Sequence, residues 1–372
     1  MNSEIPSPYK SKLYFPQLDS IRGMSFIAIF LFHALRVPDV QFFLSGFIRY
    51  LITYLQLGIE VFFVLSSFLL TFLGLNEYES RNNFSFKSYF RRRALRIWPL
   101  YFFILLVSFT IFPWLSHLLN IKMSLPNIWY YLFFISNFYT IDHVFFLRIL
   151  WSISVEEQYY LLWGACLRFF YKRLILILIF FFAISICFSL YSVYSNTPMY
   201  FNTLTYLLDF ACGGLAAIIV FNKKKLFYWI HNSSRIGTLI FYSYLPFHFT
   251  IFYFMNIHTN GIPNDLMILV SRYLFIIYMA LFIVEQMANL HRTTFFEKNR
   301  FLIFTGKISY GLYCYHGIAI TFINLLLSHY HINISNGLLV IIYFMVDYAM
   351  ATTSYFYLEN PFLKLKARWR RI

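Results

Sequence analysis

Long apolar stretches recur from one end of the sequence to the other, and they constrain the fold more than any other feature. Each contains at least 18 residues, which at about 1.5 Å per helical residue is enough to cross a hydrocarbon core about 30 Å thick. The 372-residue chain is 60% hydrophobic and only 12% charged, whereas soluble domains are about 25% charged. The sequence therefore predicts an all-α, polytopic membrane protein.

The apolar stretches predict about ten transmembrane helices in a single domain that covers residues 1–372. The expected helices are 18–37, 47–74, 97–119, 148–168, 173–193, 203–221, 236–257, 266–289, 303–327 and 336–357. An apolar run at 129–140 is too short to span, so it indicates a re-entrant or interfacial segment. The longest connections are expected at 75–96 and around 120–147. No cleavable signal peptide is expected, because the polar segment 1–17 precedes an apolar run longer than an h-region.

The distribution of positive charge predicts the topology. If both termini are cytoplasmic, the inner segments hold 25 of the 30 lysines and arginines, and the outer segments hold five. This asymmetry favours cytoplasmic termini and an even number of helices. It also accounts for most of the net charge of +15, so nucleic acid is not expected as a partner. The four cysteines lie singly in apolar runs, without the spacing of metal ligands or of a disulfide framework.

Ionisable residues inside the predicted spans are the functional candidates, because each costs about 2.5–3.5 kcal/mol at the bilayer centre. Arg22 and His33 are eleven residues apart, which places both on one helix face with a rise of about 16 Å. Asp19 lies one turn below Arg22, near the cytoplasmic surface. A neutral imidazole near mid-membrane can act as a general base. The alternative is a core histidine that is bonded to a neighbouring helix.

Two acidic residues, Glu156 and Glu157, are adjacent in the predicted helix 148–168. Neighbouring helical positions point about 100° apart, so at least one carboxylate is expected to face the interior. Such a carboxylate can orient a histidine or bind sugar hydroxyls. The alternative is a structural partner for an arginine.

A cluster of arginines meets the start of the predicted helix 97–119. Arg92 and Arg96 share a helix face at a spacing of four residues, and Arg93 and Arg96 at a spacing of three. Paired guanidinium groups bind phosphates well, although a topogenic or lipid-headgroup cluster has the same composition. Weaker candidates near mid-depth are Glu60, His248, His316 and Asp347. Each alone is typical of a packed polar residue, but together they indicate a polar central cavity or tunnel.

Four blocks of sequence resemble one known family. They are LDSIRGMSFIAIFLFHA (18–34), GIEVFFVLSSFLL (58–70) with YFRRRALRIWPLYF (89–102), SNFYTIDHVFFLRILWSISVEEQYYLLW (136–163), and GKISYGLYCYH (306–316) with LENP (358–361). In these blocks and their order the chain resembles the membrane-bound acyltransferase-3 family. Members are bacterial inner-membrane proteins that O-acylate surface polysaccharides and other extracytoplasmic sugars.

Three family motifs match the chain residue by residue. They fall on Arg22 and His33, which are separated by ten residues, on the R-x-x-R pair Arg93 and Arg96, and on the S-x-x-x-E element of Ser152 and Glu156, followed by Glu157 and Tyr160. One departure is Ser67, where members usually have glycine. The sequence also lacks a hydrolase-like segment with a G-D-S element, so the resemblance implies a chain that acts alone or with a separate partner.

The resemblance implies transfer of an acyl group, most simply acetyl, from cytoplasmic acetyl-CoA as co-substrate to a sugar hydroxyl. The acceptor would be extracytoplasmic or lipid-linked, such as O-antigen of lipopolysaccharide, capsule or exopolysaccharide, and the site would contain no metal. The implied roles are catalytic for His33, Glu156 and Glu157, acyl-CoA binding for Arg22, Arg93, Arg96 and Asp19, and acceptor or cavity lining for Tyr160, His316, Ser152 and Glu60. The implied location is the bacterial inner membrane, in contact with membrane lipids, and a homodimer is compatible with the sequence.

Two alternatives to this function remain from the sequence. A secondary transporter or flippase also uses intramembrane acids and histidines. It predicts an inverted repeat with matched broken helices, and the sequence has none. The second alternative is an acyltransferase that uses succinyl-CoA or a different acceptor, such as a membrane lipid or a glucan.

Overall fold

The computed structural model describes residues 14–35, 46–119, 123–139, 144–258 and 264–368, and within these ranges it contains helices and no strand. The long helices are α1 (Pro16–Ala34), α4 (Gly58–Arg81), α5 (Phe86–Leu118), α8 (Trp151–Phe169), α9 (Leu174–Ser195), α10 (Leu207–Phe221), α12 (Arg235–His258), α13 (Asn264–Ala288), α16 (Ser309–His329) and α17 (Asn336–Ser354). The shorter ones are α3 (Gly46–Tyr54), α6 (Trp129–Leu132), α7 (Phe145–Arg148), α11 (Lys225–His231), α14 (Phe295–Lys298), α15 (Arg300–Lys307) and α18 (Asn360–Arg368).

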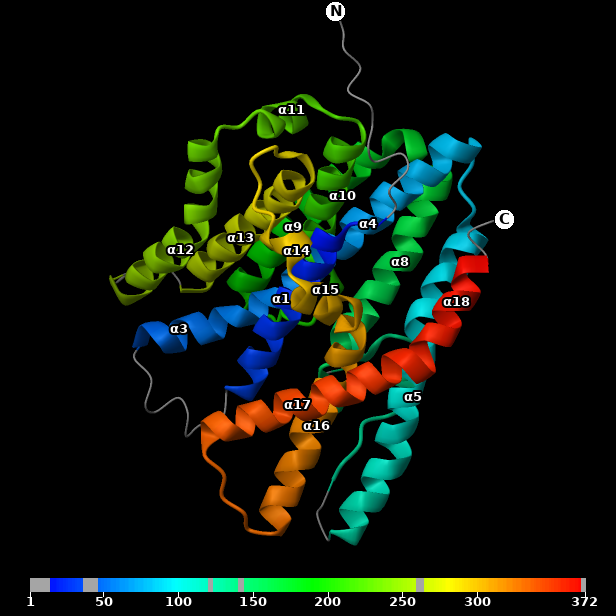
Figure 1. Cartoon of the computed structure of the whole chain (residues 1–372), viewed down its shortest axis with the longest axis vertical. Helices are drawn as coiled ribbons and strands as arrows, with labels where there is room; N and C mark the ends of the chain where they lie inside the picture. Colours follow the sequence, from blue (N-terminus) through cyan, green and yellow to red (C-terminus); the bar gives the residue numbers. More distant parts are fainter. Residues whose placement is uncertain (1–13, 36–45, 120–122, 140–143, 259–263, 369–372) are drawn as a thin grey trace, which may run out of the picture.

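The predicted polytopic all-α fold is confirmed. Eight helical segments of the described chain are long and apolar enough to cross a membrane. The predicted spans outside that set are α1 and α8, which are 19 residues each; α1 carries Asp19 and Arg22, and α8 carries Glu156 and Glu157. Figure 1 shows α1 in the middle of the bundle, with α12 and α13 on one side and α5 and α18 on the other. Helix α1, one of the two predicted spans that are not apolar enough to meet this criterion, therefore lies at the centre of the bundle.

Helix α5 begins eleven residues before the predicted start. Ser85 caps it, since the Ser85 side chain accepts a hydrogen bond from the backbone N–H of Ser88. Helix α4 also continues beyond its apolar part to Arg81. The predicted basic loop 75–96 is therefore wrong in extent, because it is mostly helical. The consequence is that the arginine cluster lies on a rigid helix.

Two predicted spans are broken into shorter helices. The 3₁₀ turn Leu55–Leu57 separates α3 from α4, and Ile308 separates α15 from α16. A π-helical turn, Tyr355–Glu359, follows α17 and leads into α18. Helix π-turns and interruptions of this kind often accompany functional sites in helical proteins.

The segment at 129–138, predicted to be re-entrant or interfacial, packs against the middle of α5. The Tyr101 hydroxyl on α5 donates a 2.9 Å hydrogen bond to the carbonyl of Tyr131. The ring of Phe134 stacks on that of Trp98, with centroids 6.2 Å apart. Buried polar groups hold the segment, because the Ser136 and Ser154 hydroxyls are 2.8 Å apart. Irregular backbone at this depth is tolerated because protein surrounds it.

Glycines fix α1 against its neighbours. A Cβ atom on Gly306 of α15 would lie 1.7 Å from the backbone oxygen of Asp19, and one on Gly23 would lie 2.5 Å from the oxygen of Leu302. The two helix backbones can therefore touch only because both positions lack a side chain. This contact sets the height of Arg22 in the bundle.

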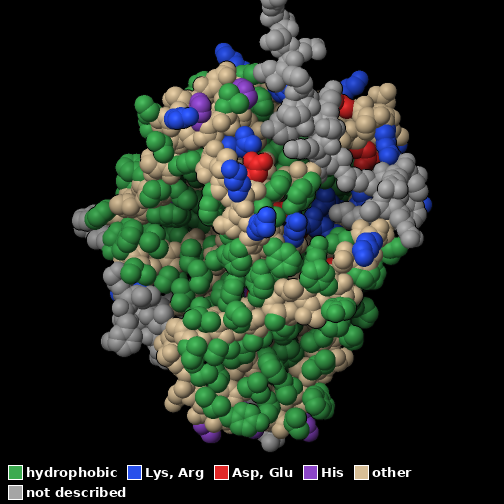
Figure 2. Space-filling view, in the orientation of Figure 1, with side chains coloured by type: hydrophobic (Ala, Val, Ile, Leu, Met, Phe, Trp, Pro, Cys, Tyr) green, Lys and Arg blue, Asp and Glu red, His purple; other side chains and the backbone are tan. Residues whose placement is uncertain are grey.

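Hydrophobic and basic side chains occupy different parts of the surface. In Figure 2 hydrophobic side chains cover most of the lower half, whereas lysines and arginines gather in the upper half. An apolar band with basic residues at one end is the pattern that the positive-inside rule describes.

Candidate functional site

Three arginines that the sequence singled out line one cavity, together with Arg81 and Arg92. Arg22 comes from α1, and Arg93 and Arg96 come from one face of α5. The cavity has a volume of about 480 Å³, and Asp19 also lines it. The Asp19 carboxylate is 3.7 Å from the Arg22 guanidinium. We call this space the basic cavity.

The same three arginines also line a smaller pocket deeper in the bundle. This inner pocket has a volume of about 70 Å³, and its polar lining beyond the arginines consists of Ser66, Ser152, Glu156, Tyr160, Ser309, Tyr310 and Tyr313. The basic cavity and the inner pocket are therefore neighbours that share these three arginines in their walls. Arg22 is 91% buried, so its charge is held inside the protein.

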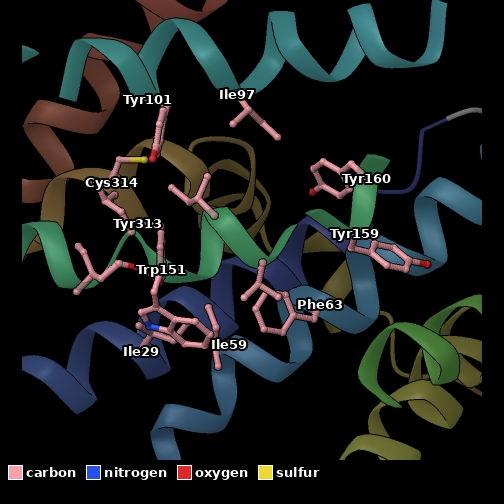
Figure 3. Close-up of a cluster of buried hydrophobic side chains, with 14 of the residues drawn as sticks. Ile29, Ile59, Phe63, Ile97, Tyr101, Trp151, Tyr159, Tyr160, Tyr313 and Cys314 are labelled. Carbon is pink, nitrogen blue, oxygen red and sulfur yellow. Dashed lines mark hydrogen bonds between the residues drawn. The ribbon is translucent and has the colours of Figure 1, made fainter. Parts of the chain in front are cut away.

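Glu156 is the acidic group of the inner pocket. Its carboxylate accepts hydrogen bonds from the Ser66 hydroxyl at 2.6 Å and from the Tyr160 hydroxyl at 3.0 Å. The guanidinium of Arg93 lies over the Tyr160 ring, 5.8 Å from its centroid. Figure 3 shows that Tyr160 and its neighbour Tyr159 point in opposite directions from α8. The S-x-x-x-E element and Tyr160 thus come together in the inner pocket, as the helix spacing predicts.

Glu157 faces a different part of the interior. Its carboxylate accepts a 3.3 Å hydrogen bond from the Trp98 indole N–H, and its other oxygen has no hydrogen-bond partner among the described residues. It is buried but does not line the inner pocket. Both carboxylates bond to other groups, and the hypothesis that Glu156 or Glu157 orients His33 stays a prediction.

His33 meets His316 of α16. The Nδ1 atom of His33 is 3.1 Å from the Nε2 atom of His316, and the two rings stack with centroids 5.1 Å apart. Phe26 lies between Arg22 and His33 along α1, and its ring is 6.1 Å from that of His316. His33 is therefore on the interior face of α1, as the spacing from Arg22 predicts. It lies in the last turn of α1, and Figure 1 shows that α5 and α16 extend well beyond that end.

Tyr313 lies between the inner pocket and the histidine pair. Its ring lines the inner pocket and is 5.4 Å from the ring of His316. Its hydroxyl accepts a 2.7 Å hydrogen bond from Ser152 and donates one of 2.7 Å to the carbonyl of Ile149. His33 lines neither the inner pocket nor the basic cavity. Tyr313 therefore contacts both the inner pocket and the histidine pair.

Glu60 is held by a buried ion cluster away from the inner pocket. Its two carboxylate oxygens accept hydrogen bonds from Arg272 at 2.8 Å each, and Asp209 accepts another from the same guanidinium at 2.7 Å. Glu60 does not line the inner pocket. The ion pair gives Glu60 a structural partner, and its expected role in acceptor or cavity lining stays a prediction. Arg272, which the charge count assigned to an outer segment, is the buried centre of this cluster.

The remaining polar candidates lie apart from the inner pocket. The imidazole of His248 is bonded to Tyr244 at 3.2 Å and to Ser271 at 3.1 Å, so it packs between α12 and α13. Asp347 is fully buried, and its carboxylate has no hydrogen-bond partner among the described residues. Within the same described ranges, no group of three or more potential ligands could hold a metal ion.

Sequence reasoning missed the contributions of Ser66 and Tyr313. Ser66 lies beside the atypical Ser67 in a family block, and Tyr313 lies in GKISYGLYCYH, so both were within the quoted motifs. They were missed because serine and tyrosine are common in this chain, which has 31 tyrosines. Only their contacts with Glu156 and Ser152 distinguish them.

Comparison with known proteins identifies the class. Residues 15–352 match the family model described as an acyltransferase domain. The chain therefore belongs to the membrane-bound acyltransferase-3 family. No solved structure matches it significantly.

Two relatives from Staphylococcus aureus illustrate the similarity. The protein of strain COL named "Putative O-acetyltransferase SACOL0978" is 28% identical over 397 residues, which cover 97% of this chain and 60% of the relative. O-acetyltransferase OatA of strain NCTC 8325 is 27% identical over 377 residues, which cover 95% of this chain and 58% of OatA. This chain thus spans about three fifths of the length of the curated relatives that it matches.

Proposed function

We propose that this protein transfers an acyl group, most simply acetyl, from cytoplasmic acyl-CoA to a hydroxyl of an extracytoplasmic or lipid-linked sugar. Membership of an acyltransferase family and the printed names of its relatives support the reaction class. The observation that carries the proposal is the convergence of Arg22, Arg93 and Arg96 on one basic cavity next to the inner pocket, which the same arginines line. The bacterial inner membrane is the proposed location.

The basic cavity is the proposed binding site for the donor phosphates. Guanidinium groups form paired, charge-assisted hydrogen bonds with phosphate oxygens. Arg93 and Arg96 lie on one face of α5, and Arg22 faces them from α1. Asp19 next to Arg22 would then fix the position of that guanidinium. A basic mouth above a narrower inner pocket suits a ligand that is anionic at one end and slender at the other.

The proposed chemical step takes place at His33. The acceptor O–H bond breaks as its proton moves to the imidazole, the oxygen attacks the thioester carbon, and the C–S bond then breaks. The departing thiolate takes up the proton, so the reaction balances without another reactant. A two-step route through an acylated histidine balances equally. Tyr313 lines the inner pocket and contacts the ring of His316, so we propose that its side chain moves when the thioester reaches His33.

Glu156, Tyr160 and Ser152 are the proposed contacts for the reactive end of the donor or for the acceptor. Their oxygens lie together in the inner pocket, and a carboxylate with hydroxyl neighbours can bind sugar hydroxyls. Glu157 is proposed to position α5 through its bond to Trp98.

The test is release of CoA and transfer of label by the purified protein in lipid nanodiscs, with acetyl-CoA and succinyl-CoA compared. We expect acetyl-CoA turnover in the presence of acceptor, loss of turnover in His33→Ala, and a higher KM for acetyl-CoA in Arg93→Gln and Arg96→Gln. Arg235→Gln is the matched control, because Arg235 is exposed and lies in neither cavity. Full activity of His33→Ala would refute the assignment of His33 as the general base. An unchanged KM for acetyl-CoA in both arginine variants would refute the basic cavity as the donor site. Mass spectrometry of surface glycans with and without the protein would name the acceptor.

A further inference from the structure

A backbone carbonyl next to the histidine pair determines which ring nitrogens of His33 and His316 donate hydrogen bonds. The Nδ1 atom of His316 is 2.7 Å from the backbone oxygen of Tyr313, in the preceding turn of α16. A carbonyl oxygen can only accept, so Nδ1 of His316 must carry the proton. The other ring nitrogen of His316, Nε2, faces Nδ1 of His33 at 3.1 Å.

The position of that proton determines the tautomer of both rings. The rings lie among Phe26 and Phe145 inside the predicted span, where the neutral forms are favoured over buried imidazolium. A neutral His316 with its proton on Nδ1 has a lone pair on Nε2. The 3.1 Å hydrogen bond therefore requires His33 to donate from Nδ1. His33 is left with its lone pair on Nε2.

We propose that His316 is a positioning residue that holds His33 as the Nδ1–H tautomer, so that Nε2 is the atom that takes the acceptor proton. The role of His33 as the general base rests on the proposed function, whereas the tautomers of the two rings do not. In aqueous solution the Nε2–H tautomer of histidine is the commoner one, and in that form Nε2 cannot accept a proton. The pair therefore selects the minor tautomer, which is the reactive one at that atom.

The pair also prepares His33 for the charged state. When the acceptor O–H bond breaks and the proton adds to Nε2, His33 becomes an imidazolium whose Nδ1–H still donates to His316. The Nδ1–H of His316 in turn still donates to the carbonyl of Tyr313. The unprotonated Nε2 atom of His316 therefore faces the positive charge on His33, and neither ring has to rearrange. The proton then leaves Nε2 for the thiolate, and the starting tautomer returns.

The direct test is ¹⁵N NMR of the full-length protein with ¹⁵N-labelled histidine in nanodiscs near neutral pH. The His33 signals are assigned by their loss in His33→Gln. We expect a protonated Nδ1 and an unprotonated Nε2 for His33, and the same for His316. A protonated Nε2 on His33 would overturn the inference. This readout does not depend on activity, so it stands even if the proposed reaction fails.

Two replacements of His316 with similar size test the role in turnover. His316→Gln keeps an oxygen near the position of Nε2 that can accept from His33, whereas His316→Met does not. We expect His316→Met to lower kcat about 10²-fold with little change in KM for the donor, and to shift His33 toward the Nε2–H tautomer. We expect His316→Gln to stay within about threefold of wild type in kcat. Equal loss in both variants, with His33 still protonated on Nδ1, would overturn the positioning role.

Discussion

Replacement of Arg272 by methionine is expected to destabilise the protein by about 3–5 kcal/mol, the usual cost of removing one partner from a buried ion pair. Arg272 donates two hydrogen bonds of 2.8 Å to Glu60 and one of 2.7 Å to Asp209. The side chains of Glu60 and Asp209 are 5% and 0% exposed. Loss of the guanidinium would leave two carboxylates close together in an apolar interior, so the upper end of the range is expected.

The charge origin of this loss is tested by removing the acids as well. In the triple variant Arg272→Met, Glu60→Gln and Asp209→Asn no buried charge remains, so we expect at least half of the lost stability to return. Arg235→Met is the control, because an exposed position should change stability by less than about 0.5 kcal/mol.

The assay is equilibrium unfolding in mixed micelles, followed by tryptophan fluorescence from the seven tryptophans. A loss below about 1 kcal/mol in Arg272→Met would contradict the reasoning, as would a triple variant no more stable than the single one. The same experiment separates structure from catalysis, since Glu60→Gln is expected to lower stability and leave the donor KM unchanged.

Three further predictions follow from single contacts. Gly306→Ala should lower both thermal stability and turnover, because its Cβ would lie 1.7 Å from a backbone oxygen of α1, whereas Gly337→Ala, with nothing within 4 Å, should change neither. Tyr160→Phe removes the 3.0 Å hydrogen bond to buried Glu156, so steady-state assays should show a loss of about tenfold in kcat/KM and unfolding assays a loss of about 1–3 kcal/mol in stability. Tyr313→Phe removes both hydrogen bonds of its hydroxyl, so acetyl-CoA hydrolysis without acceptor should rise above the wild-type rate if these bonds hold Tyr313 in place between the inner pocket and the histidine pair.

The sequence predicted the features that depend on local spacing. The interior face shared by Arg22 and His33 follows from helical periodicity, and so does the meeting of Glu156 with Tyr160 at a spacing of four residues. The start of α5 was missed, because its first three turns are basic and fail any test of apolarity. A hydropathy scale measures the free energy of transfer from water to lipid, so it cannot detect the part of a helix that continues beyond the apolar span.

Contacts between distant parts of the chain could not be predicted. His33 and His316 are 283 positions apart, and Glu60 and Arg272 are 212 apart. Periodicity places each residue on a face of its own helix, but the neighbour of that face depends on how the whole bundle packs. For this reason the partner of His33 was sought among the acids of the predicted helix 148–168, and Arg272 was counted among the five basic residues of the outer segments.

The position of Tyr313 bears on ion leakage in the proposed reaction. Its side chain lines the inner pocket, and its ring lies 5.4 Å from that of His316. An aromatic side chain at this point would hinder the movement of ions from the proposed donor side toward the histidine pair, which would help to preserve the electrical potential across the bilayer.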